Sequence, residues 1–468
     1  MIKEISNINV TDNQNIVFDL AVEERIIEYL VNKDKKEVRK LIQEIHPADI
    51  ADLLEHIRPD QREILIDFLG AEFNPKILTE LNETVFDQVI NHLGIDRITQ
   101  ALGVLNSDDV IEIFEELDKY KKQQILDSIP PFDRAIIEKG LSYPKDSAGR
   151  LMQQEVATVP NIWNVGDTID FFRSTLNDEY NSSCNLPNQF YDLFVVDSEY
   201  APIGVISLCQ LLQANRDTMV SDLMDINMKI LPSTIDQEEV AFIFRQRDLV
   251  SAPVVDLSGH LVGVITIDDV VDVIHEELGE DLMRLGGVQE GDIYDTTFST
   301  TKARFLWLLV NLITAVIASA VIGLFDATLD QMVALAILMP IVASMGGNAG
   351  TQTLTVVVRA LALKELTSIN TARVIGKEAL IGLVNGILFA ILIGFAIWIW
   401  FSNIVLALVI GLAMVVNMFV AGLAGIIIPI SFEKFDIDPA IASSVVLTAI
   451  TDVIGFFVFL GLAAILLF

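Results

Sequence analysis

The sequence predicts a multi-domain, mainly α-helical membrane protein. Its soluble part, an all-α domain followed by an α/β module, precedes five transmembrane helices. Three observations support this class: helical hydrophobic spacing through the first 145 residues, a strand–strand–helix pattern written twice, and five long apolar segments in the last third of the 468-residue chain. We place the helical domain at 1–145, the α/β module at 146–275, an acidic connecting helix at 276–303 and the membrane domain at 304–468.

The helical domain contains an internal repeat. Residues 49–69 (DIADLLEHIRPDQREILIDFL) recur sixty residues later as 109–129 (DVIEIFEELDKYKKQQILDSI). In the first copy, Ile50, Leu53 and Leu54 begin the i, i+3, i+4, i+7 spacing of a half-buried helix. We therefore expect a superhelical stack of short helices.

The α/β module is also a repeat. In the first copy a strand at 193–197 is followed, seven residues on, by a second at 204–207. The second copy keeps this spacing between strands at 253–256 and 263–266. Extra polar sequence at 176–189 predicts a longer loop in the first copy.

Both copies resemble cystathionine-β-synthase (CBS) domains. The segment Gly263-Val-Ile-Thr-Ile-Asp-Asp269 is close to the C-terminal signature of that family, whereas the first copy ends in Ser207-Leu-Cys-Gln210 and lacks the acid. The resemblance implies that Thr266 and Asp269 hold the phosphate and ribose of ATP or another adenine nucleotide.

The charge of the chain lies almost entirely in its soluble part. Of 64 acids and 31 bases, ten and seven follow residue 290, which leaves 54 acids and 24 bases, a net charge of −30, in the first 290 residues. Such a surface argues against nucleic acid, whose phosphates require Lys and Arg, and favours metal cations. The acids are densest from 269 to 295, directly before the membrane domain, where we expect one helix.

Five segments reach the roughly 20 apolar residues needed to cross a bilayer. The loops beside them carry bases on one side only: Lys302 and Arg304 precede the first span, and four bases lie between the second and third. Positive-inside counting therefore places the N-terminus and the soluble domains in the cytoplasm and the C-terminus outside the cell membrane. The five spans are 305–324, 332–358, 380–401, 404–430 and 441–468.

The second span contains glycines and amides at 340–360. Lipid offers no hydrogen bonds, so Gly-rich or irregular backbone must either pack against protein or line a cavity. Gly346, Gly347 and Gly350 are compatible with close helix packing and with the lining of a cavity. Polar residues at about one-turn spacing then share one side of the helix; they are Asn348, Thr351, Gln352 and Thr355.

Asp452 is the one ionisable residue that we place well away from both ends of a span, and Thr448 shares its face. A charge at the bilayer centre costs at least ~2.5 kcal/mol, so it normally marks an ion path or a proton relay. Carboxylates, amides and hydroxyls are hard ligands, and the membrane part has no Cys or His for a soft metal. This chemistry leaves Mg²⁺, Mn²⁺, Ca²⁺ and protons open.

The domain order resembles the MgtE family of magnesium channels. So do five motifs: His46-Pro-Ala-Asp49, Ala148-Gly-Arg-Leu-Met152, Gly347-Asn-Ala-Gly-Thr-Gln352, Asp438-Pro-Ala440 and Thr451-Asp452. The resemblance implies an ion channel rather than an enzyme. It also implies a homodimer in the bilayer, with a pore on its two-fold axis and Mg²⁺ as both substrate and regulator.

The resemblance places Gly347, Asn348 and Asp452 near the hydrated ion, with Asp452 as the selectivity carboxylate. With the polar residues that share their helix faces, the expected pore set is Gly347, Asn348, Thr351, Gln352, Thr355, Thr448 and Asp452. The acids expected to bind regulatory Mg²⁺ and close the pore are Asp236, Asp248, Asp269, Asp272, Glu277, Glu280, Asp281 and Asp438.

Two rival functions are weighed against the channel. A membrane-anchored nucleotide sensor would need neither Asp452 nor the polar line at 348–355. A proton-coupled transporter would use Asp452 as a proton carrier and show pH-driven uptake, whereas a channel would pass current down the electrochemical gradient.

Overall fold

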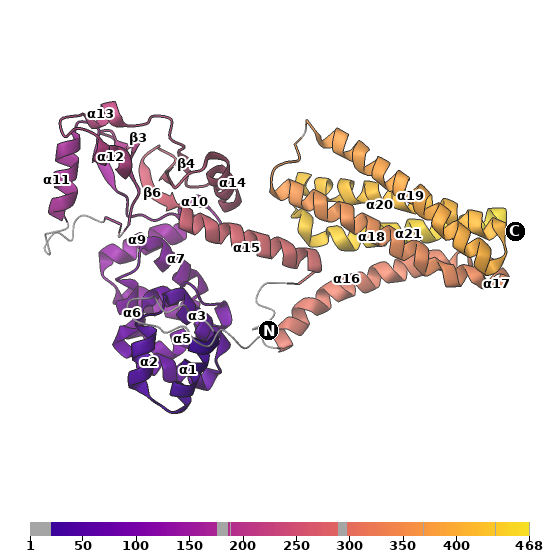
Figure 1. Cartoon of the computed structure of the whole chain (residues 1–468), viewed down its shortest axis with the longest axis horizontal. Coiled ribbons are helices and arrows are strands. Elements are labelled where there is room, and N and C mark those ends of the chain that lie inside the picture. Colours follow the sequence, from indigo (N-terminus) through magenta and orange to yellow (C-terminus); the bar gives the residue numbers. More distant parts are fainter. Residues whose placement is uncertain are drawn as a thin grey trace, which may run out of the picture. The chain divides into compact units, whose positions relative to one another are not determined.

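The computed structural model describes residues 20–175, 186–187, 189–288, 297–367, 369–435 and 437–467 (Figure 1). The chain divides into two compact units, Met1–Glu276 and Glu277–Phe468. Most of the loop expected at 176–189 lies outside the described residues, as does the stretch 289–296 at the end of the expected connecting helix.

The all-α domain is a stack of short helices, as the sequence predicts. Each copy of the internal repeat folds as a helix–break–helix pair, α3 with α4 and α7 with α8. Proline begins α3, α4 and α9, where its missing N–H costs no hydrogen bond. The helices are α1 (Leu20–Val31), α2 (Lys35–Ile42), α3 (Pro47–His56), α4 (Pro59–Leu69), α5 (Glu83–Leu93), α6 (Ile95–Leu102), α7 (Ser107–Glu116), α8 (Lys119–Ser128) and α9 (Pro131–Ser142).

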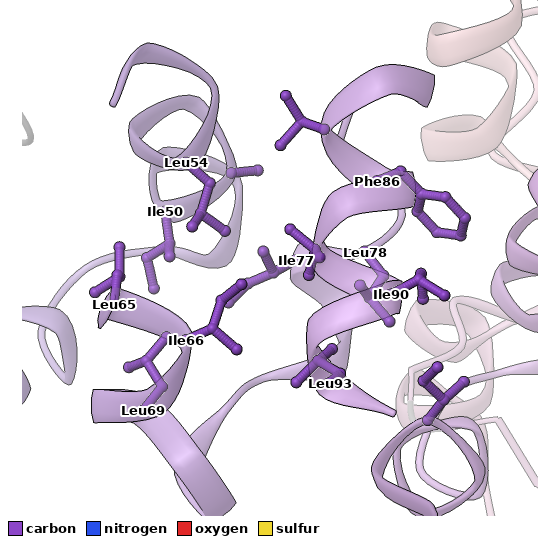
Figure 2. Close-up of a cluster of buried hydrophobic side chains, with 14 of the residues drawn as sticks. Ile50, Leu54, Leu65, Ile66, Leu69, Ile77, Leu78, Phe86, Ile90 and Leu93 are labelled. Carbon is purple, nitrogen blue, oxygen red and sulfur yellow. The ribbon is translucent and has the colours of Figure 1, made fainter. Parts of the chain in front are cut away.

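A single hydrophobic core joins these helices. Figure 2 shows Ile50 and Leu54 from α3 beside Leu65 and Ile66 from α4. Phe86 of α5 lies in the same core, which extends to Ile125 of α8 and Ile137 of α9. The spacing read from residues 50–57 therefore identifies the buried face correctly.

The two α/β copies share one topology. Each forms a three-stranded sheet in which a short strand, absent from the sequence prediction, pairs in parallel with the expected hairpin. The first sheet is β1 (Thr158–Pro160), β2 (Asp192–Val196) and β3 (Pro202–Ser207), and the second is β4 (Leu231–Pro232), β5 (Ser251–Val255) and β6 (Leu261–Thr266). Their helices are α10 (Ala148–Leu151), α11 (Val165–Thr175), α12 (Leu208–Gln213), α13 (Val220–Leu223) and α14 (Gln237–Arg247).

The connecting helix, α15 (Ile267–Gly286), begins directly after β6. It therefore starts nine residues before the boundary that we place at 276, and it crosses the division between the two units. Its acids are distributed along about five turns.

Five helices of the described chain are long and apolar enough to cross a bilayer, as predicted. They extend the expected spans mainly at their polar ends. A short helix, α17 (Asp326–Gln331), separates the first two. The five are α16 (Thr297–Gly323), α18 (Ala334–Ala362), α19 (Thr371–Phe401), α20 (Ile404–Lys434) and α21 (Pro439–Leu466).

Candidate functional site

The polar residues of α18 lie on its exposed face. Ser344, Asn348, Thr351, Gln352 and Thr355 are all exposed within this single chain. The helix satisfies part of their hydrogen-bonding capacity, since the Thr351 hydroxyl donates to the Gly347 carbonyl at 2.9 Å and the Thr355 hydroxyl donates to the Thr351 carbonyl at 2.9 Å. Four of these residues line a groove of about 680 Å³. This is a polar surface on a helix that is otherwise apolar.

The backbone at 340–360 is a continuous helix, so the glycines do not introduce an irregular break. A Cβ on Gly346 would lie 2.2 Å from Nδ2 of Asn417, and one on Gly350 would lie 2.8 Å from Leu447. These two glycines allow close helix packing. Gly347 has no atom within 4 Å of the position of a Cβ and faces open space beside Asn348. The packing interpretation therefore applies to Gly346 and Gly350, whereas Gly347 makes no close packing contact.

Asp452 is partly buried on α21. Among the described residues, no Lys or Arg forms an ion pair with it. Thr448, one turn earlier, is exposed and donates to the Ser444 carbonyl at 2.8 Å. Leu447 packs on Gly350 and Leu354, which holds this part of α21 against α18. The two helices that carry the expected pore residues are thus in contact.

A second carboxylate lies within the membrane helices. The sequence analysis placed Glu378 outside the third span, but α19 begins at Thr371, and Glu378 is only 9% exposed. A buried carboxylate two turns from the start of α19 is therefore present in addition to Asp452 of α21. Thr353 of α18 donates its hydroxyl to Glu378 Oε2 at 3.0 Å. The apolar run that defines the expected third span begins only at residue 380, so Glu378 falls with Arg373 and Lys377 in the expected loop.

The end of α15 is tied to the start of α21 through a base that the sequence analysis did not single out. The Arg284 guanidinium pairs with both Glu280 and Asp438. Burial, and then the carboxylates of Asp438 and Glu277, raise the pKa of Asp281, against the lowering effect of Arg284. Asp438 therefore lies beside acids of α15, with the Arg284 guanidinium between the carboxylates of Glu280 and Asp438.

A separate acidic cluster lies within the first unit, where α7 meets the start of α15. Asp108 is within electrostatic reach of Asp269, and Asp109 of Asp268. One oxygen of Asp108 and one of Asp109 are buried without a hydrogen-bond partner. A cation would supply that missing partner. Further acids around the cluster are Glu80, Glu112 and Asp272.

Two carboxylates of this cluster have strongly raised pKa values. Burial and repulsion from Asp269 raise the pKa of Asp108 well above its usual range. Burial and the neighbouring Asp268 raise the pKa of Asp269 to about 7, although hydrogen bonds from Thr266 oppose the shift. Within the described residues, no three His, Cys, Asp or Glu side chains converge on one metal position.

The other expected site residues have local structural roles. The Thr266 hydroxyl donates to Asp269 Oδ2 at 3.0 Å, so the two residues expected to hold a nucleotide engage each other. Asp236 caps α14 by accepting from the Glu238 N–H at 2.9 Å. Asp248 ends α14 with a φ of 52°. Asp236 and Asp248 lie at opposite ends of a helix roughly 16 Å long and cannot share one ion.

Three family models match separate parts of the chain. Residues 45–146 match the MgtE intracellular N domain, residues 220–276 the CBS domain, and residues 339–462 the MgtE model described as a divalent cation transporter.

Curated relatives match almost end to end. A protein of Bacillus subtilis named magnesium transporter MgtE is 30% identical over 451 residues, which cover 96% of this chain and 98% of the relative. A Thermus thermophilus protein of the same name is 30% identical, and the match covers 94% of this chain and 97% of that protein. Among solved structures, the cytosolic domain of the Mg²⁺ channel MgtE in complex with ATP is 29% identical, with a TM-score of 0.49, and the match covers 54% of this chain and 99% of that one. From the near-complete match to the curated relatives, this multi-pass membrane protein belongs to the MgtE family.

Proposed function

We propose that this protein is a Mg²⁺-selective uptake channel of the cell membrane. The observation that carries the proposal is the exposed line of amides and hydroxyls on α18, in contact with the helix that bears Asp452. Exposing these polar side chains or the Asp452 carboxylate to lipid would cost free energy, whereas both are suited to a hydrated path. The names of the curated relatives support Mg²⁺ as the ion.

A homodimer would complete the path. Mg²⁺ sheds water reluctantly and is usually held by one or two carboxylates and several waters. One Asp452 per chain gives two carboxylates on a two-fold axis. The amides of Asn348 and Gln352 and the hydroxyl of Thr448 would then contact the hydration shell. The exposure of these residues in a single chain supports a partner surface at this face.

Cytoplasmic Mg²⁺ would regulate this pore through two groups of acids on α15. In the first, Asp269 lies within electrostatic reach of Asp108 on α7, and Asp272 within reach of Glu112 on the same helix. The second, Glu280 and Asp281, lies beside Asp438 at the start of the last span. A cation bound between such carboxylates replaces repulsion with attraction, so binding favours the compact state. High internal Mg²⁺ would thereby close the pore.

Binding of ATP or another adenine nucleotide at Thr266 and Asp269 stays a prediction from the CBS resemblance. Asp269 is already surrounded by carboxylates, an environment that favours a cation over a phosphate.

Ion flux into proteoliposomes tests the channel directly. Asp452→Asn should abolish or strongly reduce Mg²⁺ flux while the protein still inserts. Asp330→Asn, which neutralises an exposed carboxylate of α17, is the matched control and should leave flux intact. Wild-type flux in the Asp452 variant would show that the carboxylate serves packing and would overturn the proposed pore.

A further inference from the structure

Glu378 is a buried carboxylate that the proposed pore does not use. It lies on α19, two turns into the helix, and both Glu378 and its partner Thr353 are less than a tenth exposed. The only hydrogen bond that the described residues give its carboxylate comes from the Thr353 hydroxyl, to Oε2. An ionised carboxylate can accept about four hydrogen bonds, so this one keeps most of its capacity.

No positive side chain compensates this charge. Among the described residues, no Lys, Arg or His forms an ion pair with Glu378. A buried charge without a compensating partner strongly destabilises the folded state. An ionisable residue inside a membrane domain is therefore a functional candidate.

The carboxylate lines a cavity. Its volume is about 310 Å³. Its polar lining comes from two helices, Asn348, Gln352 and Thr353 from α18 and Glu378 and Asn385 from α19, and the rest of the lining, such as Met345, Phe389 and Met418, is apolar. A water molecule occupies about 30 Å³ in the liquid, so a cation with six waters requires roughly 200 Å³. The cavity can therefore hold a hydrated divalent cation.

The cavity adjoins the polar face of α18. Asn348 and Gln352 line both this cavity and the groove on the exposed face. The two amides thus form a shared wall between Glu378 and the expected ion path. An ion held at Glu378 would be separated from that path by side chains that can exchange hydrogen bonds with its water.

We propose that Glu378, with Thr353, Asn385 and the shared amides, forms a second cation site in the membrane domain, which binds a hydrated divalent cation beside the pore. The ligands are one carboxylate, one hydroxyl and neutral amides, all hard oxygen donors suited to Mg²⁺ or Mn²⁺. The proposal rests on the proposed cation channel for the source of the ion, but Glu378 lies on a different helix from Asp452.

Anomalous diffraction from crystals of the full chain in Mn²⁺ tests the site. We expect a peak in the cavity beside Glu378 in the wild type and its loss in Glu378→Gln, which keeps an oxygen to accept from Thr353. Loss of outer-shell partners already costs about 10–100-fold in metal affinity, so loss of the one carboxylate should weaken binding at least ~10-fold. Glu378→Asp, which keeps the charge, should retain a weaker peak.

Flux measurements separate this site from the pore. Glu378→Gln should raise the external Mg²⁺ concentration at half-maximal flux and leave Mg²⁺ selectivity unchanged, whereas Asp452→Asn should remove flux while the Mn²⁺ peak at Glu378 persists. Absence of the peak in the wild type would overturn the site and leave the channel intact. Loss of pH-driven flux in Glu378→Gln without any peak would identify a proton carrier instead and would equally overturn the site. A peak at Glu378 in a chain whose Mg²⁺ flux survives Asp452→Asn would support the site and overturn the proposed pore.

Discussion

The side-chain amide of Asn417 in α20 donates to the backbone carbonyl of Val342 in α18 at 2.8 Å. Asn417 is fully buried, and Gly346 and Gly455 pack on it from α18 and α21. The Asn417 side chain thus links its own helix, α20, to α18 and α21 at the level of the expected pore residues. The two glycines allow this contact because each lacks a side chain at the point where the amide lies.

The Asn417 contact predicts different responses from neighbouring glycines. Gly346→Ala places a methyl group 2.2 Å from Nδ2 of Asn417 and should destabilise the membrane domain by about 1–3 kcal/mol. Gly347→Ala is the matched control, because nothing lies within 4 Å of its Cβ. Thermal unfolding of the purified full chain in detergent compares the two. Equal midpoints would show that the three helices can separate without cost at Asn417.

If cytoplasmic Mg²⁺ closes the proposed pore, removal of the Arg284 guanidinium should make it close at lower Mg²⁺. Arg284 pairs with Glu280 and Asp438 and so competes with a metal ion for both carboxylates. A near-surface charge pair is worth about 1–4 kcal/mol, so Arg284→Gln should lower the closing Mg²⁺ concentration roughly tenfold.

Recordings from inside-out patches, with Mg²⁺ raised on the cytoplasmic face, measure this shift. Arg284→Lys keeps the positive charge and should behave like the wild type. A shift to higher Mg²⁺ in Arg284→Gln would mean that the guanidinium itself holds the closed arrangement.

The acidic cluster between α7 and α15 predicts an unusual pH dependence. The pKa of Asp269 rises from 3.8 to about 7, so the folded state holds a proton that the unfolded state has lost. Stability without divalent cations should therefore decrease as the pH rises from about 4 to about 7 and then level off. Above pH 7, Mg²⁺ can replace the proton and should restore stability.

Thermal unfolding of the full chain at pH 5 and pH 8, with and without Mg²⁺, measures both effects. Mg²⁺ should raise the midpoint more at pH 8 than at pH 5. Asp269→Asn should reduce the pH dependence, while Asp60→Asn, on exposed α4 surface, should not. An unchanged pH profile in Asp269→Asn would show that this carboxylate does not control the cluster.

Sequence periodicity is sufficient to predict the secondary-structure elements but not the contacts between them. Hydrophobic spacing and span length predicted the helical repeat, the paired α/β copies and the five membrane helices, because burial requires those patterns locally. Glu378 falls outside the predicted span because the apolar run begins only at residue 380. Asp108 and Asp109 resembled an ordinary acidic first turn of α7, and only the fold brings them to Asp269.

Membrane orientation can be checked at the chain ends. The bases beside the spans predict the N-terminus inside and the C-terminus outside. Small epitope tags at both ends of the full chain, probed in intact and permeabilised cells, should show the C-terminal tag accessible without permeabilisation and the N-terminal tag accessible only after it. The reverse pattern would contradict the orientation and place the acidic domains outside.

The exposed polar face of α18 predicts where two copies meet. Thr355 belongs to that face, whereas Leu392 on α19 is 64% exposed and belongs to an apolar surface that suits lipid. If the pore lies on a two-fold axis, the two Thr355 positions of a dimer face each other across it. In a chain without its native Cys184 and Cys209, Thr355→Cys should therefore cross-link to a dimer with a short bifunctional maleimide. Leu392→Cys should not, because lipid separates the copies there. Cross-linking at Leu392 with none at Thr355 would place the interface on α19 and leave the polar face of α18 as the lining of a path within a single chain.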